Sequence, residues 1–353
     1  MGLGFLGYTM VGEPGGSKYP IPVTSNTLDE TVTPLIDEGV HGYGIGNLHG
    51  DSYSKLNYCI GAITHEGDIG GSVFTGTGNA AEAFKIMLRS AILGTGGANR
   101  FDGIDVVASP GGGEYNYHYP GLTADFPTID SSLLKCLCDS FTLTGNAGGI
   151  ITYTARYRSV GRSRVAQTPG TYAPSATGAY SFEPTTPYVS EVANDDSNPL
   201  NWFQAPFRVF GASDDGTEET ILNQGSTISA WNISIANNVV LEQTFSGTNF
   251  PSIVAVGQMA ITGSFTYYLP NADYSAPLKQ SATVIIPFGG LKLVMGHIYI
   301  NNAPVPMQGA NSLVTRTVNF EAFAPGAGKV INDTYDSYTY TSAEHDASLL
   351  LVE

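Results

Sequence analysis

The stretch that decides the fold is T-I-S-A-W-N-I-S-I-A-N-N-V-V-L-E at 227–242, followed after a gap by V-G-Q-M-A-I-T-G-S-F-T-Y-Y-L at 256–269. In the first arm Trp231, Ile233 and Ile235 alternate with smaller, mostly polar residues. In the second arm the same alternation involves Met259, Ile261, Phe265 and Tyr267. A period of two over this length predicts two β-strands, each with one face toward a core and a hydroxyl- or amide-rich face toward water.

The pair Asn237-Asn238 ends the first arm. Asparagine tolerates the left-handed backbone conformation that a sharp turn requires. The sequence therefore predicts that the chain changes direction at these two residues.

A second hairpin is predicted around a Gly-rich loop, G-N-A-G-G at 145–149. Before the loop Phe141 and Leu143 alternate with threonines, and after it apolar residues alternate with Thr and Arg over 151–158. This hairpin resembles the one at 227–269, and the echo predicts an internal duplication into two related β units.

One helix is predicted, from Asn79 to Leu93. Asn79 is the expected N-cap, Glu82 stands at the capping-box position, and Gly94 follows as a stop signal. The apolar stripe of this helix is expected to pack on a sheet and consists of Ala80, Phe84, Met87, Leu88, Ala91 and Ile92.

These signals predict a mainly β fold, a β-sandwich or barrel with one packing helix. The expected divisions are an extended N-terminal arm at 1–35, a first β unit at 36–160, a linker or long loop excursion at 161–200, a second β unit at 201–325, and a polar C-terminal tail at 326–353. An arm with little core of its own is expected to be locally disordered or to dock on its own chain, and the alternative is that it lies on a neighbouring subunit.

Composition and charge limit the classes of function that fit this chain. Of 353 residues 42% are hydrophobic and only 13% are charged, and the formal net charge is -16. Such a chain repels phosphate, so a tight grip on DNA or on an anionic membrane is not expected. The three cysteines predict no disulfide framework. With no apolar run of 18 residues and no signal-peptide pattern, synthesis in a cytoplasm is expected.

Catalytic and metal-binding patterns are weak, so the sequence predicts neither an enzyme nor a cofactor or metal site. The six histidines lack H-E-x-x-H or H-x-H pairing. The run His65-Glu66-Gly67-Asp68 is interpreted as a polar strand end, and Asp195-Asp196 and Asp214-Asp215 as acidic turns, because the alternating calcium-loop ligands are missing.

The two strand motifs also resemble a known family. I-S-I-A-N-N at 233–238 followed by G-x-x-x-x-T-G-S-F at 257–265 is similar to the tail tube (major tail) proteins of tailed bacteriophages. E-G-D-I at 66–69 ahead of the predicted helix resembles the N-terminal part of that family. The assembly and fold motif consists of Trp231, Ile233, Ile235, Asn237, Asn238, Thr262, Gly263, Ser264 and Phe265.

The resemblance implies a structural virion protein that polymerises with copies of itself into stacked trimeric or hexameric rings. Such a tube lies in the phage tail, contacts a tape measure and a tail terminator protein, and lets DNA pass without specific binding. The resemblance implies no membrane contact and no cofactor.

Two alternatives stay open at the level of sequence. The inner tube of a contractile injection system would share the same fold. A tail accessory protein that binds or depolymerises carbohydrate would be the enzyme-class alternative, although the two tryptophans are few for a saccharide cleft.

Overall fold

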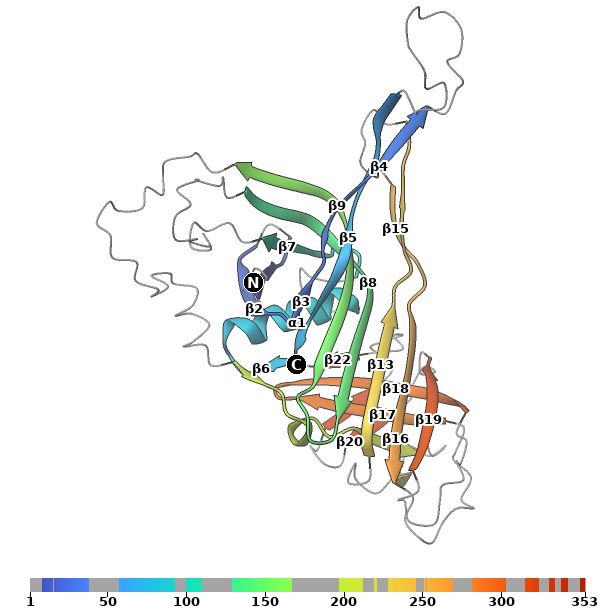
Figure 1. Ribbon diagram of the computed structural model, residues 1–353. Helices are drawn as coiled ribbons and strands as arrows, with labels where there is room; N and C mark the ends of the chain where they lie inside the picture. The colour runs from blue at the N-terminus through green and yellow to red at the C-terminus, as the bar shows by residue number, and fades with distance from the viewer. Residues whose placement is uncertain are drawn as a thin grey trace, which may run out of the picture.

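The computed structural model describes residues 8–14, 16–37, 57–92, 100–109, 129–166, 197–211, 219–220, 228–245, 251, 253–268, 281–302, 315–323, 330–333, 338–341 and 350–352. These residues form a mainly β fold with one α-helix, which confirms the predicted fold class. Figure 1 shows long antiparallel strands running through the molecule, with the helix beside them.

Within the described residues, sixteen strands belong to one sheet. In chain order they are β1 (Tyr8–Gly12), β2 (Lys18–Pro22), β3 (Ser25–Asn26), β4 (Asp29–Asp37), β5 (Asn57–Ser72), β7 (Ile104–Ser109), β8 (Ile129–Asn146), β9 (Thr152–Ala166), β11 (Arg208–Gly211), β12 (Glu219–Thr220), β13 (Ile228–Ala236), β16 (Ala260–Tyr268), β17 (Ser281–Phe288), β18 (Leu291–Asn302), β19 (Thr315–Ala322) and β22 (Leu350–Val352). Three two-stranded pairs complete the strands: β6 (Phe74–Thr75) with β10 (Asn198–Pro199), β14 (Val239–Glu242) with β15 (Ile253–Val256), and β20 (Val330–Asp333) with β21 (Tyr338–Thr341).

The two hairpins predicted from sequence lie side by side in the centre of this sheet. Strand β8 pairs with β9 on one side and with β13 on the other, and β13 pairs in turn with β16. Phe141 stands opposite Ile235, and Leu143 stands opposite Ile233. All four side chains are fully buried. The predicted alternation is therefore confirmed, while the internal duplication stays a prediction.

The part of the sheet that contains β11 and β17 curls over and packs on the central strands. Between β17 and β13 the hydrogen-bonded order runs through β18, β19 and β16. Nevertheless the ring of Phe288 on β17 lies 6.5 Å from that of Trp231 on β13. Phe207, just before β11, lies 5.6 Å from Trp231 and 5.5 Å from Phe265. One core thus forms between two parts of the same face of the sheet, as in a sandwich or partial barrel.

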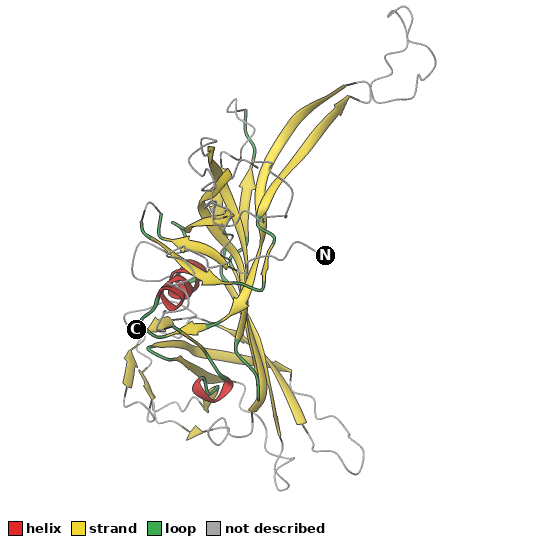
Figure 2. Cartoon of the chain, turned by 60° about the vertical axis from the view of Figure 1, so that its left-hand side comes forward, coloured by secondary structure: helices red, strands yellow, loops and turns green. Residues whose placement is uncertain are grey.

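Helix α1 (Asn79–Ala91) covers the apolar face of the sheet, and Figure 2 shows it to one side of the long strands. Phe84 packs against Phe141 and Tyr153, with ring centroids 6.3 and 5.6 Å apart. The predicted stripe is buried throughout, which confirms the packing.

The predicted N-cap of the helix is wrong. Gly78 is the N-cap and Asn79 is the first helical residue, with no capping hydrogen bond from a side chain at that position. Instead the amide N–H of Ala81 donates to the hydroxyl of Ser197 at 2.9 Å, so a distant residue satisfies one of the free donors of the first turn. The helix ends at Ala91 rather than at Leu93, and Gly94 lies outside the described residues.

The described part of the N-terminal segment pairs with its own chain. Strand β1 lies between β2 and β7, and β3 and β4 both pair with β5. Val11 and Ile21 are fully buried. At the other end of the sequence β22 pairs with β18, so residues 350–352 of the expected polar tail also join the main sheet.

Residues 57–72 form one strand, β5, and this corrects the interpretation of His65-Glu66-Gly67-Asp68 as a strand end. These four residues lie inside β5 and pair with β4 or β9. His65 is fully buried. Most of the predicted linker, 167–196, and the acidic turn at Asp214-Asp215 lie outside the described residues.

Candidate assembly surfaces

The predicted motif divides into a core part and a polar part. Trp231, Ile233, Ile235 and Phe265 point into the core, with exposed fractions of 6% or less. Thr262 and Ser264 alternate with the buried residues of β16 and lie on its opposite face. The apolar half of the motif therefore builds the fold, and only the polar half is available for contacts outside the chain.

Gly263 belongs to the motif because two neighbours approach it closely. A Cβ atom at this position would meet the ring of Phe320 and would lie 2.8 Å from the carbonyl oxygen of Asn232. Phe320 stands directly opposite Gly263 in the pairing of β16 with β19. Glycine leaves room for the aromatic ring at this position, where any side chain would displace it.

Asn237 and Asn238 form the predicted turn. Asn238 adopts a φ of 50°, the left-handed conformation, and its side-chain amide donates to the carbonyl of Gln258 at 2.9 Å. Asn237 is fully buried and donates to the carbonyls of Ala91 and Cys138, each at 3.0 Å. The turn thereby connects strand β13, strand β8 and the end of helix α1.

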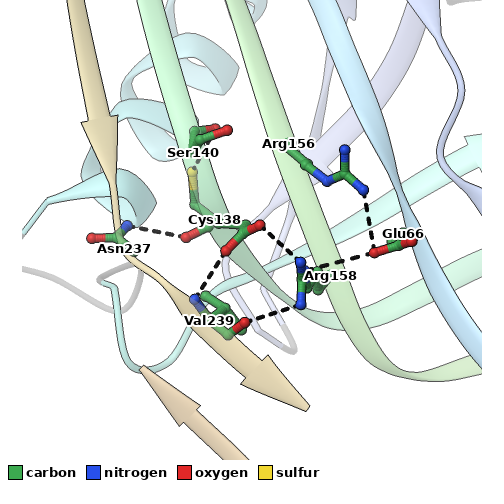
Figure 3. A network of polar contacts seen from close by, with 8 residues as sticks. Glu66, Cys138, Ser140, Arg156, Arg158, Asn237 and Val239 are labelled. Atoms are coloured by element: carbon green, nitrogen blue, oxygen red, sulfur yellow. Dashed lines mark hydrogen bonds and ion pairs between the residues drawn. The ribbon is translucent and has the colours of Figure 1, made fainter. Parts of the chain in front are cut away.

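Beyond the turn the chain continues as the β14–β15 hairpin, whose root is held by a polar network (Figure 3). The carboxylate of Asp139 accepts the amide N–H of Val239 at 2.9 Å. Arg158 donates to the carbonyl of Val239 at 3.1 Å and pairs with Asp139 at 3.2 Å. Both backbone groups of Val239 are therefore tied to charged side chains of β8 and β9.

The network extends along the sheet to Glu66 on β5. Its carboxylate lies 3.7 Å from Nε of Arg158 and 3.4 Å from the guanidinium of Arg156. Because these side chains are about a third exposed, each of these two ion pairs contributes no more than about 1 kcal/mol to folding. Their main effect is to place a carboxylate beside each of these two arginines on this face.

The polar face of the central strands carries rows of hydroxyl and amide side chains, with one carboxylate, Glu321, at the end of one row. The pairing of β9, β8, β13, β16 and β19 aligns two such rows. One row consists of Thr152, Thr144, Asn232, Ser264 and Asn319, and the next consists of Thr154, Thr142, Ser234, Thr262 and Glu321. Neighbours hydrogen-bond across the strands, as from Asn232 to Thr144 at 3.1 Å and from Thr142 to Ser234 at 3.4 Å.

The buried titratable groups are poorly suited to chemistry. Burial raises the pKa of the Cys136 thiol to about 12, and burial together with the Asp139 carboxylate raises that of Cys138. Burial likewise raises the pKa of the Tyr153 hydroxyl. These groups stay protonated near neutral pH, and a protonated thiol is a weak nucleophile.

Among the described residues, no three His, Cys, Asp or Glu side chains gather into a possible metal site. In the same part of the chain, none of the helices has the length and apolar character needed to cross a membrane.

Sequence reasoning missed the β14–β15 hairpin and the network at its root. V-V-L-E and I-V-A-V at 239–242 and 253–256 are short apolar runs that could have indicated two strands. Glu66 and Arg156 lie far apart in the sequence, and no local pattern predicts their ion pair. Asp139 and Arg158 lie on the two strands of the predicted hairpin, but their ion pair was not predicted.

Comparison with known proteins agrees with this geometry. Residues 61–322 match the family described as phage tail tube protein, which covers most of the chain and both strand motifs. The chain belongs to this family, and it is a structural protein of the phage tail. No curated protein sequence matches it.

Proposed function

We propose that copies of this chain polymerise into stacked rings that form the tail tube, through which DNA passes. The observation that carries the proposal is the match to the tail tube family across residues 61–322, joined to a sheet whose path of described pairings ends at β12 and β2. Terminal strands of a sheet offer backbone donors and acceptors to another chain, and a closed ring satisfies them.

In this proposal the polar rows on β9, β8, β13, β16 and β19 line the channel. Their hydroxyl and amide groups give DNA phosphates no positive charge to hold, and Arg156 and Arg158 on the same face already pair with carboxylates. The net charge of -16 adds repulsion at longer range. DNA would therefore slide along the wall without specific binding.

The same proposal places the protein in the virion tail after synthesis in the host cytoplasm. Its partners would be further copies of itself, a tape measure protein inside the tube and a tail terminator at one end. Three copies per ring follow if the two hairpins represent a duplicated unit, and six copies follow if they do not.

Electron microscopy of the purified protein tests polymerisation. Hollow tubes of uniform diameter are expected, and averaged cross-sections give the number of copies per ring. A protein that stays monomeric at high concentration and in the presence of its tail partners would contradict the proposal.

A labelling experiment tests which face lines the channel. Thr262→Cys is expected to react in assembled tubes with a small maleimide but not with a maleimide on a large polymer, which cannot enter the channel. Lys85→Cys on helix α1, on the opposite side of the sheet, is the matched control and is expected to react with both. Equal reaction of Thr262→Cys with both reagents would place the polar rows on the outside.

A further inference from the structure

The β14–β15 hairpin carries an exposed and largely apolar face. Val240 stands opposite Ala255 and Glu242 stands opposite Ile253, so these four side chains share one face. All four are exposed, Val240 by 46% and Ile253 by 49%. Phe245, just beyond β14, is fully exposed. A soluble monomer has little reason to place this much apolar surface on a projecting hairpin.

A second exposed apolar surface lies at the turn between β8 and β9. Trp202 and Phe203 form a short 3-10 helix, η2 (Trp202–Gln204), and are 47% and 64% exposed. Their rings meet edge to face at 6.1 Å. They border an open groove of about 210 Å³. Its other lining residues come from 145–147, 205–207 and 228–231.

The groove is built on a rigid backbone. The amide N–H of Trp202 donates to the carbonyl of Gly149 at 3.1 Å, and the amide of Gln204 donates to the carbonyl of Asn201 at 3.0 Å. The side chain of Gln204 accepts from the amide of Asn201 in return, at 3.1 Å. The backbone that carries the two aromatic rings is thus held in place, so a partner that binds them does not have to order that segment first.

The two surfaces lie at opposite ends of strand β13. Ala230 pairs with Asn146 at the groove end, and Ala236 pairs with Ser140 at the hairpin end. The nine residues of β13 span about 30 Å at roughly 3.3 Å per residue. Figure 1 shows β15 in the upper part of the molecule and the lower ends of β8 and β13 far below it. One copy therefore cannot fill its own groove with its own hairpin.

From this placement we propose that the β14–β15 hairpin of one copy docks in the Trp202–Phe203 groove of a second copy. The contact is heterologous, since two different surfaces meet, and it repeats from copy to copy without closing on a pair. The inference rests on the proposed tube and names the contact that joins its subunits end to end.

Charge favours a second copy as the occupant. In a chain with a net charge of -16, two copies repel each other over most of their surfaces. The groove lining contains no charged residue. On the exposed face of the hairpin, Glu242 is the one charged residue among the four. These are surfaces on which two such acidic chains can meet without placing like charges together.

The area also suits a polymer. Burying what is still exposed of Phe245, Trp202 and Phe203 would remove on the order of 400 Å² from water, since an aromatic side chain buries roughly 200 Å² and Trp202 and Phe203 are already partly buried. A stable pair of proteins usually buries about 1,600 Å². One such contact alone would be weak. A ring makes the contact several times at once, and this multivalency supplies the affinity that a single contact lacks.

Photocrosslinking tests the contact directly. Phe245 is replaced by benzoyl-phenylalanine, tubes are assembled and irradiated, and the crosslinked peptides are identified by mass spectrometry. We expect crosslinks to peptides that contain 145–147 or 202–207, found between copies and not within one. Tubes whose crosslinks lead to other parts of the chain or to another tail protein, or that give none, would overturn the inference while the proposed tube stands. Failure of the wild-type chain to form tubes would instead count against the proposed function.

Introducing a pair of opposite charges provides an independent check. Phe245→Lys and Phe203→Asp are each expected to raise the concentration needed for polymerisation at least tenfold, and the double variant is expected to recover much of that loss through a new ion pair. Tyr299→Ser removes another exposed aromatic residue, outside both surfaces, and is expected to polymerise like the wild type. Strictly additive losses in the double variant would contradict the contact.

Discussion

The side-chain amide of Asn237 donates to the backbone carbonyl of Ala91 at 3.0 Å, although the two residues are 146 positions apart. The same amide donates to the carbonyl of Cys138, also at 3.0 Å. One buried asparagine thus fixes the end of the helix, strand β8 and the start of the β14–β15 hairpin relative to one another.

Replacing Asn237 by alanine is expected to destabilise the fold by about 1–3 kcal/mol, because two buried carbonyl groups lose their donor. Urea unfolding of the unassembled chain measures this cost. Asn232→Ala is the matched control, since Asn232 is only partly buried and donates to the hydroxyl of Thr144. We expect the control to lose less than about 1 kcal/mol, and equal losses in the two variants would argue against the role of Asn237.

Gly145→Ala is expected to destabilise the chain by about 1–3 kcal/mol through overpacking. A Cβ atom at Gly145 would overlap the indole ring of Trp231, which lies opposite it in the sheet. Gly149→Ala in the same turn is the control, because its Cβ would approach only the carbonyl of Asn146, at 3.4 Å. Thermal unfolding compares the two, and a stable Gly145→Ala variant would show that Trp231 can move aside.

Arg158→Met is expected to loosen the β14–β15 hairpin more than the rest of the chain. The change removes the bond to the carbonyl of Val239 and the ion pair with Asp139. Amide hydrogen exchange should speed up several-fold at 239–242 and 253–256, while the exchange of β8 and β13 changes little.

Arg156→Met is the matched control, because Arg156 pairs only with Glu66 among the contacts of this network and does not reach the hairpin. Its hairpin amides should exchange at the wild-type rate. Similar acceleration in both variants would mean that the hairpin root responds to charge on the sheet in general rather than to Arg158.

Alkaline pH is expected to destabilise the fold through the buried thiols. In the unfolded chain a cysteine titrates near 9.0, whereas burial raises the pKa of Cys136 to about 12 and also raises that of Cys138. As pH rises above 9 the unfolded state loses its proton first, so stability falls toward pH 12. The slope approaches about 1.4 kcal/mol per pH unit for each thiol.

Urea unfolding between pH 8 and 10 checks this slope against a variant that keeps every tyrosine, because tyrosine also ionises near pH 10. The variant with Cys136→Ala and Cys138→Ala is expected to show a clearly flatter dependence than the parent chain, with Cys59→Ser present in both. An unchanged slope would assign the alkaline loss to other groups. In the folded parent chain the two buried thiols should also react with a disulfide reagent only after denaturant is added.

The central strands could be predicted because their pattern is local. The buried residues Trp231, Ile233 and Ile235 alternate along one strand, and this period of two is visible without any partner. The left-handed turn at Asn238 was predictable for the same reason, since the residue type alone favours it. The helix stripe likewise follows from spacing within one segment.

What sequence could not predict depends on contacts between distant segments. Ser197 satisfies the first turn of the helix from more than 110 positions away, so the local capping signal at Asn79 was misleading. The closeness of Gly145 to Trp231 arises only once β8 and β13 pair. The groove bordered by Trp202 and Phe203 likewise exists only after the chain has folded, because the residues that line it come from three separate stretches.

A projecting hairpin lies at one end of β13 and a receiving groove lies at the other. This placement has a consequence for the length of the tube. A stack built by joining unlike ends always finishes with one unused hairpin layer and one unused groove layer, so nothing in the subunit says when to stop. Tail length would then have to be measured by a separate ruler molecule. A protein that halts growth would need to imitate only one of the two ends, and which end it imitates would fix the direction in which the cylinder grows.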